Sequence, residues 1–268
     1  MNMALKDGKR KVVTLSYDDG VIYDERLMQI CDKNGLKCTF NISSGLYGDD
    51  TFRLSGENCV KLYKDSGHEV AIHGYTHPFF TKLASDELVF EITEDRRNLE
   101  NDYGTVIRGC AYPFGDYNDE VTKALDNCGI VYARTVDSTE GFDFPENWLK
   151  LHPTCHHKNP NLMELAKKFI EMKATFGRCF MFYLWGHSYE FNNDNNWEII
   201  EEFAEYMGGR DDIWYATNIE IYDYIQAYKN LHVSFDRSLV TNVSAIDVWV
   251  TEDDKTYCVK AGETVKIK

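Results

Sequence analysis

The feature that most constrains the fold is a regular alternation of short apolar segments with amphipathic segments, which continues to about residue 229. The apolar segments are rich in β-branched and aromatic residues, so they predict strands. The candidate strands are Lys11–Tyr17, Lys37–Ile42, Glu69–Ile72, Val106–Ala111, Ile130–Arg134, Trp148–Leu151, Cys179–Trp185 and Ile213–Ala216. Strands that alternate with helices run parallel, so the fold class is α/β. About seven or eight parallel strands fit a (β/α) barrel better than an open doubly wound sheet, which remains the alternative.

The segments between these strands have helical periodicity, and most of them run directly into a glycine. They are Asp24–Asn34, Glu57–Ser66, Ser85–Tyr103, Asn118–Cys128, Asn161–Phe176, Asn195–Met207 and Asn218–Lys229. A glycine just past a helix adopts the left-handed conformation without steric cost, so it marks the helix end. Ser85 and Asn118 are the expected N-caps of their helices, because acidic residues follow each in the first turn.

The pattern changes after Asn230, where helical periodicity stops. Short strands separated by polar turns are expected at Val233–Phe235, Ala245–Val250, Thr256–Val259 and Thr264–Ile267. We therefore predict two parts, a barrel over residues 1–229 and a small β-rich C-terminal appendage over residues 230–268.

Composition and charge exclude several classes of protein. There are 29 basic and 44 acidic residues, a formal charge of −15, with no basic run, so nucleic acid is not expected as a partner. No apolar stretch approaches the roughly 20 residues of a membrane helix, so no membrane association is expected. No apolar segment follows the basic residues near the N-terminus, and the eight cysteines contain no CxxC pair. These features predict a cytoplasmic protein with reduced cysteines.

Polar residues with reactive side chains follow several of the predicted strands. In a parallel barrel all these strand ends open on one face, where the chemistry is done. The residues at these ends are Asp18 and Asp19 after the first strand, His73 and His77 after the third, Pro113–Gly115 after the fourth, and His187 after the seventh. We therefore expect them to converge in space.

His73 and His77 are four residues apart, so both imidazoles can share a metal if their loop forms one helical turn. Two histidines alone are more often ordinary surface residues, but a third hard ligand is available from the Asp18–Asp19 pair. Adjacent carboxylates repel each other unless their roles differ, and a metal on one would leave the other free as a base. The alternative is a plain polar turn, which Asp-Asp-Gly also favours.

His187 is suited to general-acid catalysis, because an imidazole titrates near neutral pH. A histidine hydrogen-bonded to the loop backbone is the alternative. Cys155-His156-His157 is a second candidate ligand cluster, but the sequence offers it no partners at suitable spacing, so we interpret it as a plain loop.

Taken together, four motifs resemble those of the polysaccharide deacetylase family, which includes chitooligosaccharide and peptidoglycan deacetylases and acetylxylan esterases. In order, they are Ser16-Tyr17-Asp18-Asp19-Gly20, His73-xxx-His77, Tyr112-Pro113-Phe114-Gly115 and Trp185-Gly186-His187. The resemblance spans roughly Lys11 to Ala227. It implies a distorted (β/α) barrel that binds one divalent metal, most often zinc, with cobalt, nickel or manganese as alternatives.

The resemblance also implies a role for each motif residue. Asp19, His73 and His77 are the implied metal ligands. Asp18 is the implied general base, His187 the general acid, and the Phe114 N–H the oxyanion donor. The family usually has an arginine two residues before the proline of the third motif, to orient the base. Here Arg108 lies five residues before Pro113, and Arg134 after the fifth predicted strand is another candidate. The family's fourth motif has no clear match.

These residues predict a hydrolase that removes N- or O-linked acetyl groups from an acetylated oligo- or polysaccharide by activating water on a metal. Two alternatives are kept. One is a metal-dependent amidohydrolase that acts on a small non-carbohydrate amide. The other is a catalytically silent sugar-binding module, which is less favoured because all five motif carboxylates and imidazoles are present.

Overall fold

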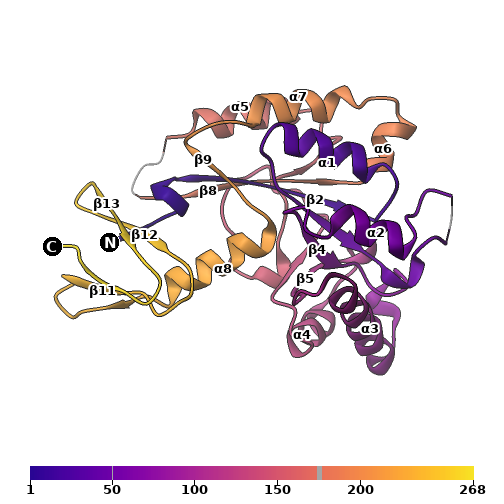
Figure 1. The fold of residues 1–268 in the computed structure, drawn as a ribbon, viewed down its shortest axis with the longest axis horizontal. Helices are drawn as coiled ribbons and strands as arrows, with labels where there is room; N and C mark the ends of the chain where they lie inside the picture. Colours follow the sequence, from indigo (N-terminus) through magenta and orange to yellow (C-terminus); the bar gives the residue numbers. More distant parts are fainter. Residues whose placement is uncertain (50, 174–176) are drawn as a thin grey trace.

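The computed structural model describes residues 1–49, 51–173 and 177–268, and its centre is a sheet of parallel strands surrounded by helices (Figure 1). The strands are β2 (Lys11–Asp18), β3 (Cys38–Ile42), β4 (Glu69–Ile72), β5 (Gly109–Ala111), β6 (Tyr132–Arg134), β7 (Cys155–His156), β8 (Phe180–Gly186) and β9 (Ile213–Tyr215). Their order is β6-β5-β4-β3-β2-β8-β7, with β9 paired to the first half of β2. The predicted strands at these positions are confirmed, with shorter bounds for β5 and β6.

The two edges of this sheet are connected by residues 147–157. Leu151 forms a parallel bridge with Arg134 of β6, and β7 pairs with β8. The predicted strand Trp148–Leu151 is wrong, because Trp148–Lys150 is a 3-10 turn whose Leu149 N–H donates to the Asn147 side chain (2.9 Å). The sequence analysis did not predict β7. The sheet therefore curls into a distorted (β/α) barrel, as predicted.

Eight helices cover the outside of the barrel in the part of the chain that the structure describes. They are α1 (Asp24–Lys33), α2 (Gly56–Tyr63), α3 (Ser85–Tyr103), α4 (Asp119–Asn127), α5 (Leu162–Glu171), α6 (Ser188–Asn193), α7 (Glu198–Met207) and α8 (Asn218–Lys229). The bounds of α3 and α8 are confirmed. Helix α6 was not predicted, because a six-residue helix gives too short a periodic signal. The predicted end of α5 extends over residues 174–176, which lie outside the described residues.

The predicted helix caps are confirmed in part. Asn118 caps α4 by accepting from the Val121 N–H at 2.9 Å. Ser85 does not cap α3, because the N-cap is Ala84, whose N–H donates to the Glu87 side chain at 2.9 Å. Glu87 thus caps α3 by accepting from the N-cap N–H, whereas a serine hydroxyl at the N-cap would accept from an N–H of the first turn.

Successive residues of the central strands point alternately to the helices and to the barrel interior. In β2 three apolar residues belong to the core beneath the helices, and three polar residues are buried on the opposite side, next to a second apolar cluster that includes Val12. The apolar set is Val13, Leu15 and Tyr17, and the polar set is Thr14, Ser16 and Asp18. Hydrogen bonds from Thr14 to Asn218 (2.9 Å) and from Asn41 to Ser16 (2.8 Å) link the polar residues across the interior. The catalytic face is the end of this polar interior.

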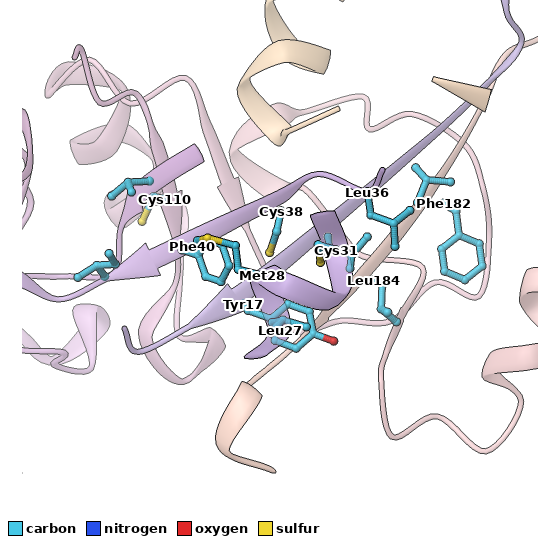
Figure 2. Packing of buried hydrophobic residues seen from close by; sticks show 14 of the residues in the cluster. Tyr17, Leu27, Met28, Cys31, Leu36, Cys38, Phe40, Cys110, Phe182 and Leu184 are labelled. Carbon is cyan, nitrogen blue, oxygen red and sulfur yellow. The ribbon is translucent and has the colours of Figure 1, made fainter. Parts of the chain in front are cut away.

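The main core lies between the sheet and the helices, and Figure 2 shows part of it. Leu27, Met28 and Cys31 of α1 pack toward the strands, and Phe182 and Leu184 of β8 belong to the same cluster. Phe182 is fully buried, and its ring lies among those of Phe142, Phe169 and Phe203. All eight cysteines are free of disulfides.

The C-terminal appendage consists of two three-stranded sheets and includes the N-terminus of the chain. Its strands are β10 (His232–Val233), β11 (Leu239–Thr241), β12 (Val248–Glu252), β13 (Lys255–Val259) and β14 (Thr264–Lys266), together with β1 (Asn2–Ala4), which pairs with β12. Val240, Val250, Val259 and Ile267 form its small core. Figure 1 shows both termini in this region. No helix among the described residues is long and apolar enough to cross a membrane.

Replacing Phe182 with alanine is expected to lower the free energy of unfolding by about 3–5 kcal/mol, because the cavity left among three aromatic rings cannot fully collapse. Chemical denaturation measures this change. Val106→Ala is the matched control, since Val106 is 66% exposed and should change stability by less than about 0.5 kcal/mol. Equal stabilities for the two variants would contradict the assigned core.

Candidate metal centre and active site

The strand ends bring the predicted site residues together on one face of the barrel. Asp18 is the last residue of β2 and Asp19 follows it, His73 follows β4, and His187 follows β8. Asp18 Oδ2 lies 3.8 Å from both His73 Nε2 and His187 Nε2. The convergence expected from the parallel topology is therefore present in the structure.

Asp19, His73 and His77 form one cluster of potential metal ligands. The two Nε2 atoms of His73 and His77 are 3.1 Å apart, and Asp19 Oδ1 is 4.0 Å from the first and 3.9 Å from the second. His73 is almost fully buried, whereas His77 and Asp19 are partly exposed, so the cluster is open on one side. Two nitrogen ligands that each lie about 2.1 Å from one zinc ion are separated by a distance close to the 3.1 Å between these Nε2 atoms.

The tautomer of His73 fits a metal site. Its Nδ1 lies 2.8 Å from the carbonyl oxygen of Ala111, which only accepts hydrogen bonds, so Nδ1 carries the proton. The lone pair of Nε2 is then directed at His77 and Asp19. A carbonyl that accepts from the far nitrogen is the usual arrangement behind a metal-binding histidine. The three side chains could therefore hold one divalent cation.

The loop that carries the two histidines is a tight turn and not the helical turn that the sequence analysis considered. The His77 N–H donates to the Gly74 carbonyl at 3.3 Å, and Gly74 and His77 have φ values of 76° and 56°. Asp19 also has a positive φ, 82°. Two of the three candidate ligands thus adopt a backbone conformation that is sparsely populated by residues other than glycine, as often occurs at functional sites.

Two carboxylates of α3 hold this loop in place, and neither was singled out from the sequence. Asp95 accepts from the His73 N–H (3.0 Å), and Glu91 accepts from the N–H of Thr76 (2.8 Å). Burial raises the pKa of Asp95 to about 7, although its hydrogen bonds to Ser44 and His73 oppose this shift. The i,i+4 spacing of Glu91 and Asp95 places both on one face of α3.

Asp18 is held ionised by contacts on both of its oxygens. Asn41 Nδ2 donates to Oδ1 at 2.8 Å, and the guanidinium of the fully buried Arg134 contacts Oδ2. Burial raises the pKa of Asp18, but Arg134 and the two nearby imidazoles outweigh it and lower the pKa to about 2. Arg134 in turn packs over the Trp185 ring at 4.3 Å.

Of the two arginines considered for Asp18, the structure places Arg134 there. Arg108, named as a candidate catalytic residue, forms a bidentate ion pair with Asp223 of α8 at 2.9 and 2.5 Å, so the expectation that it orients the base is wrong. Arg108 precedes the first residue of β5, whereas Arg134 is the last residue of β6 and lies at the strand end that carries the candidate site. Asn41 was missed, although a polar residue near the end of an otherwise buried strand could have signalled it.

His187 lies beyond Asp18 and is also contacted from its own helix. Its Nδ1 is 3.3 Å from the Glu190 carboxylate. Burial lowers the pKa of His187, but the hydrogen bond to Glu190 and the charges of Asp18 and Asp19 outweigh it and raise the pKa above its ordinary value. The imidazole therefore favours the protonated form that a general acid requires.

Phe114 borders the cluster on another side. Its φ is 57°, its ring lies 4.5 Å from that of His77, and it stacks on Phe79 at 4.0 Å. Both phenyl rings are about half exposed. The turn Pro113–Gly115 thus places an aromatic surface next to the candidate metal ligand His77.

Fold and site together define an α/β barrel protein with a candidate hydrolase centre at the carboxyl ends of its strands. Residues 5–133 match the family model described as polysaccharide deacetylase. The chain is 26% identical over 133 residues to chitin deacetylase 1 of Cryptococcus neoformans. The aligned segment covers 49% of this chain and 27% of that protein. This chain therefore matches only about a quarter of that relative's length. Residues 5–133 are therefore similar to the polysaccharide deacetylase family.

Solved structures share the fold of this chain. A candidate polysaccharide deacetylase from Mycobacterium smegmatis is similar at a TM-score of 0.64 and 18% identity, covering 85% of this chain and 94% of that one. A family 4 carbohydrate esterase pseudoenzyme from Bacillus anthracis is similar at a TM-score of 0.51 and 20% identity, over 79% of this chain and 65% of that one. The enzymes of this family hydrolyse amide or ester bonds of acetylated carbohydrates, but the fold also occurs without activity.

Replacing His77 with alanine is expected to weaken binding of a divalent cation by more than about 100-fold, since even residues that only orient a ligand contribute about 10- to 100-fold. Isothermal titration calorimetry of the metal-free protein measures this. Asp18→Asn should retain the cation, because Asp18 is held by Arg134 and Asn41 instead. His232→Ala, in an exposed strand of the appendage, is the control. Unchanged affinity in His77→Ala would contradict the assignment of the cluster.

Proposed function

We propose that this chain is a metal-dependent hydrolase that removes acetyl groups from an acetylated carbohydrate. The observation that carries the proposal is the convergence of Asp19, His73 and His77 on one point, with Asp18 and His187 directly beside them. These five residues supply what hydrolysis of an amide or ester requires: a cation site, a base and an acid.

A divalent cation bound by Asp19, His73 and His77 would act as a Lewis acid and lower the pKa of a water molecule at its open position. Zinc is the expected metal for two imidazoles and one carboxylate, with cobalt, nickel or manganese as alternatives because availability and geometry decide occupancy.

Asp18 is placed to take a proton from the attacking water. A carboxylate whose pKa is about 2 is a weak base, so it suits only a water that is already acidified. Base and cation site are therefore expected to work together, and neither alone should support turnover.

His187 is the proposed donor of a proton to the leaving atom, because Glu190 and the charges of Asp18 and Asp19 raise its pKa above the ordinary value and so favour the protonated imidazole. A leaving amine needs this proton more than a leaving alkoxide does. The dependence on His187 should therefore be steeper for N-acetyl than for O-acetyl substrates.

The Phe114 N–H is the proposed donor to the oxyanion, where one hydrogen bond is worth about 3 kcal/mol. The stacked rings of Phe79 and Phe114, at 4.0 Å, form an exposed aromatic surface beside it. A sugar ring presents an apolar face that packs well on such a surface. This supports an acetylated carbohydrate as the substrate.

Two alternative functions make predictions that differ from those of a carbohydrate deacetylase. A silent sugar-binding module is disfavoured, because the candidate metal ligands and the proposed base and acid lie close together, although a pseudoenzyme with this fold exists. A hydrolase of a small non-carbohydrate amide would use the same five residues and is distinguished only by substrate. The predicted cytoplasmic location and the exclusion of nucleic acid remain predictions.

The experiment is to strip the protein with a chelator, add back single metals, and measure acetate release from chitooligosaccharides, acetylxylan, aryl acetates and small amides. Activity should vanish on stripping and return with zinc on a carbohydrate substrate. Full activity after complete removal of metal would refute the mechanism. Turnover of small amides alone would select the alternative substrate.

Asp18→Asn and His187→Gln are each expected to lower kcat by more than about 100-fold, the usual contribution of a general base or acid. Both variants keep the three metal ligands, so metal content should be unchanged. Arg108→Gln is the control, because its partner Asp223 lies on α8 and not at the site. Full activity of Asp18→Asn would show that the base has been assigned to the wrong residue.

A further inference from the structure

A second group of ionisable residues lies beside His187. His156 Nε2 and His157 Nε2 are 3.1 and 3.4 Å from Glu190 Oε2, and the three side chains could by composition hold a metal ion. The sequence analysis interpreted His156 and His157 as a plain loop because no partner was visible. The partner is Glu190, on the unpredicted helix α6.

The proton on His156 argues against a metal in this group. The Lys158 N–H donates to His156 Nδ1 at 3.1 Å, so Nδ1 is unprotonated and Nε2 carries the hydrogen of the neutral ring. Nε2 then faces Glu190 as an N–H and not as a lone pair. This is the reverse of His73, whose Nδ1 proton is bound by a carbonyl oxygen.

Glu190 is instead the acceptor at the centre of a ring of donors. Its Oε2 accepts from the backbone N–H of His187 at 3.3 Å and lies 3.3 Å from His187 Nδ1. Lys158 Nζ contacts its other oxygen at 3.0 Å and also contacts Asp194 at 2.7 Å. A carboxylate with this many donors is fixed in position and stays ionised, and Glu190 has a pKa below its ordinary value despite partial burial.

His157 is a buried neighbour of Glu190 and packs among aromatic rings. It is 1% exposed, and its ring lies between those of Tyr17 (5.8 Å) and Phe191 (4.1 Å). Burial lowers the pKa of His157 to about 2, so it adds no positive charge that would compete with His187 for Glu190.

We propose that Glu190 is a positioning residue for His187, holding the ring through Nδ1 so that a protonated Nε2 faces Asp18 and the leaving group. The proposal rests on the proposed function, in which His187 is the general acid. Nδ1 is bound by Glu190, and Nε2 is 3.8 Å from Asp18 Oδ2. Both nitrogens thus have an acidic neighbour, which is the geometry of an oriented imidazolium.

Several charged groups face His187, and the effect of Glu190 must be separated from theirs. Asp18 and Asp19 lie at the end of β2, Tyr189 and Glu190 belong to α6, and His156 belongs to β7, with its ring 6.3 Å from that of His187. Of these acidic groups, Glu190 is the one whose carboxylate contacts Nδ1, at 3.3 Å. Removing its charge should therefore lower the pKa of His187 while the other neighbours stay in place.

The test is the pKa of His187 measured by NMR titration of its ring protons in the metal-loaded protein. Glu190→Gln keeps an oxygen for the His187 N–H but removes the charge, so the pKa should fall by about 1 unit or more. Asp194→Asn is the matched control, because Asp194 contacts the same lysine but not His187. Glu190→Asp keeps the charge on a shorter side chain, so its His187 pKa should lie between the values of the wild type and Glu190→Gln.

Activity gives an independent readout. In Glu190→Gln the alkaline limb of the kcat/KM profile should move to lower pH, and kcat should fall about 10- to 100-fold with KM unchanged. An unchanged His187 pKa in Glu190→Gln, or an equal fall in Asp194→Asn, would overturn the proposal. Absence of acetate release from the wild-type protein would refute the proposed function instead, and the titration would still decide the role of Glu190.

Discussion

Two adjacent carboxylates at the end of one buried strand are the constraint on which the rest of the site depends. Asp18 and Asp19 repel each other, and the fold separates them by giving each a different partner. The buried guanidinium of Arg134 holds Asp18, and a positive φ of 82° turns Asp19 toward the two imidazoles. One carboxylate is thereby held ionised as the proposed base, and its neighbour remains available as a proposed ligand for a cation.

The barrel permits this separation because the end of its interior near the site is lined by polar residues. The alternation of β2 sends Ser16 and Asp18 inward, where Asn41 binds both, while Leu15 and Tyr17 pack under the helices. The inward residues are satisfied by hydrogen bonds, so burial does not leave them unpaired. One side of β2 therefore packs in the core, and the other side supports the candidate site.

Much of the fold and the site could be predicted from sequence because both follow from local pattern. Strand and helix periodicity located most elements, and parallel topology brought Asp19, His73 and His77 together. Contacts that depend on tertiary packing could not be predicted from local sequence patterns. Arg108 and Arg134 are both plausible in sequence, and only the curl of the sheet places Arg134 at Asp18. The pairing of the N-terminal strand with the appendage and the short helix that carries Glu190 likewise leave no periodic signal.

The central claim is that one cation binds between the turn that ends β2 and the loop after β4. Anomalous diffraction at the zinc edge, from crystals of the zinc-loaded protein, tests it most directly. The account predicts one strong peak within about 2.3 Å of a carboxylate oxygen of Asp19 and of Nε2 of His73 and His77. A peak among His156, His157 and Glu190 instead, or none between the two imidazoles of the first cluster, would contradict it.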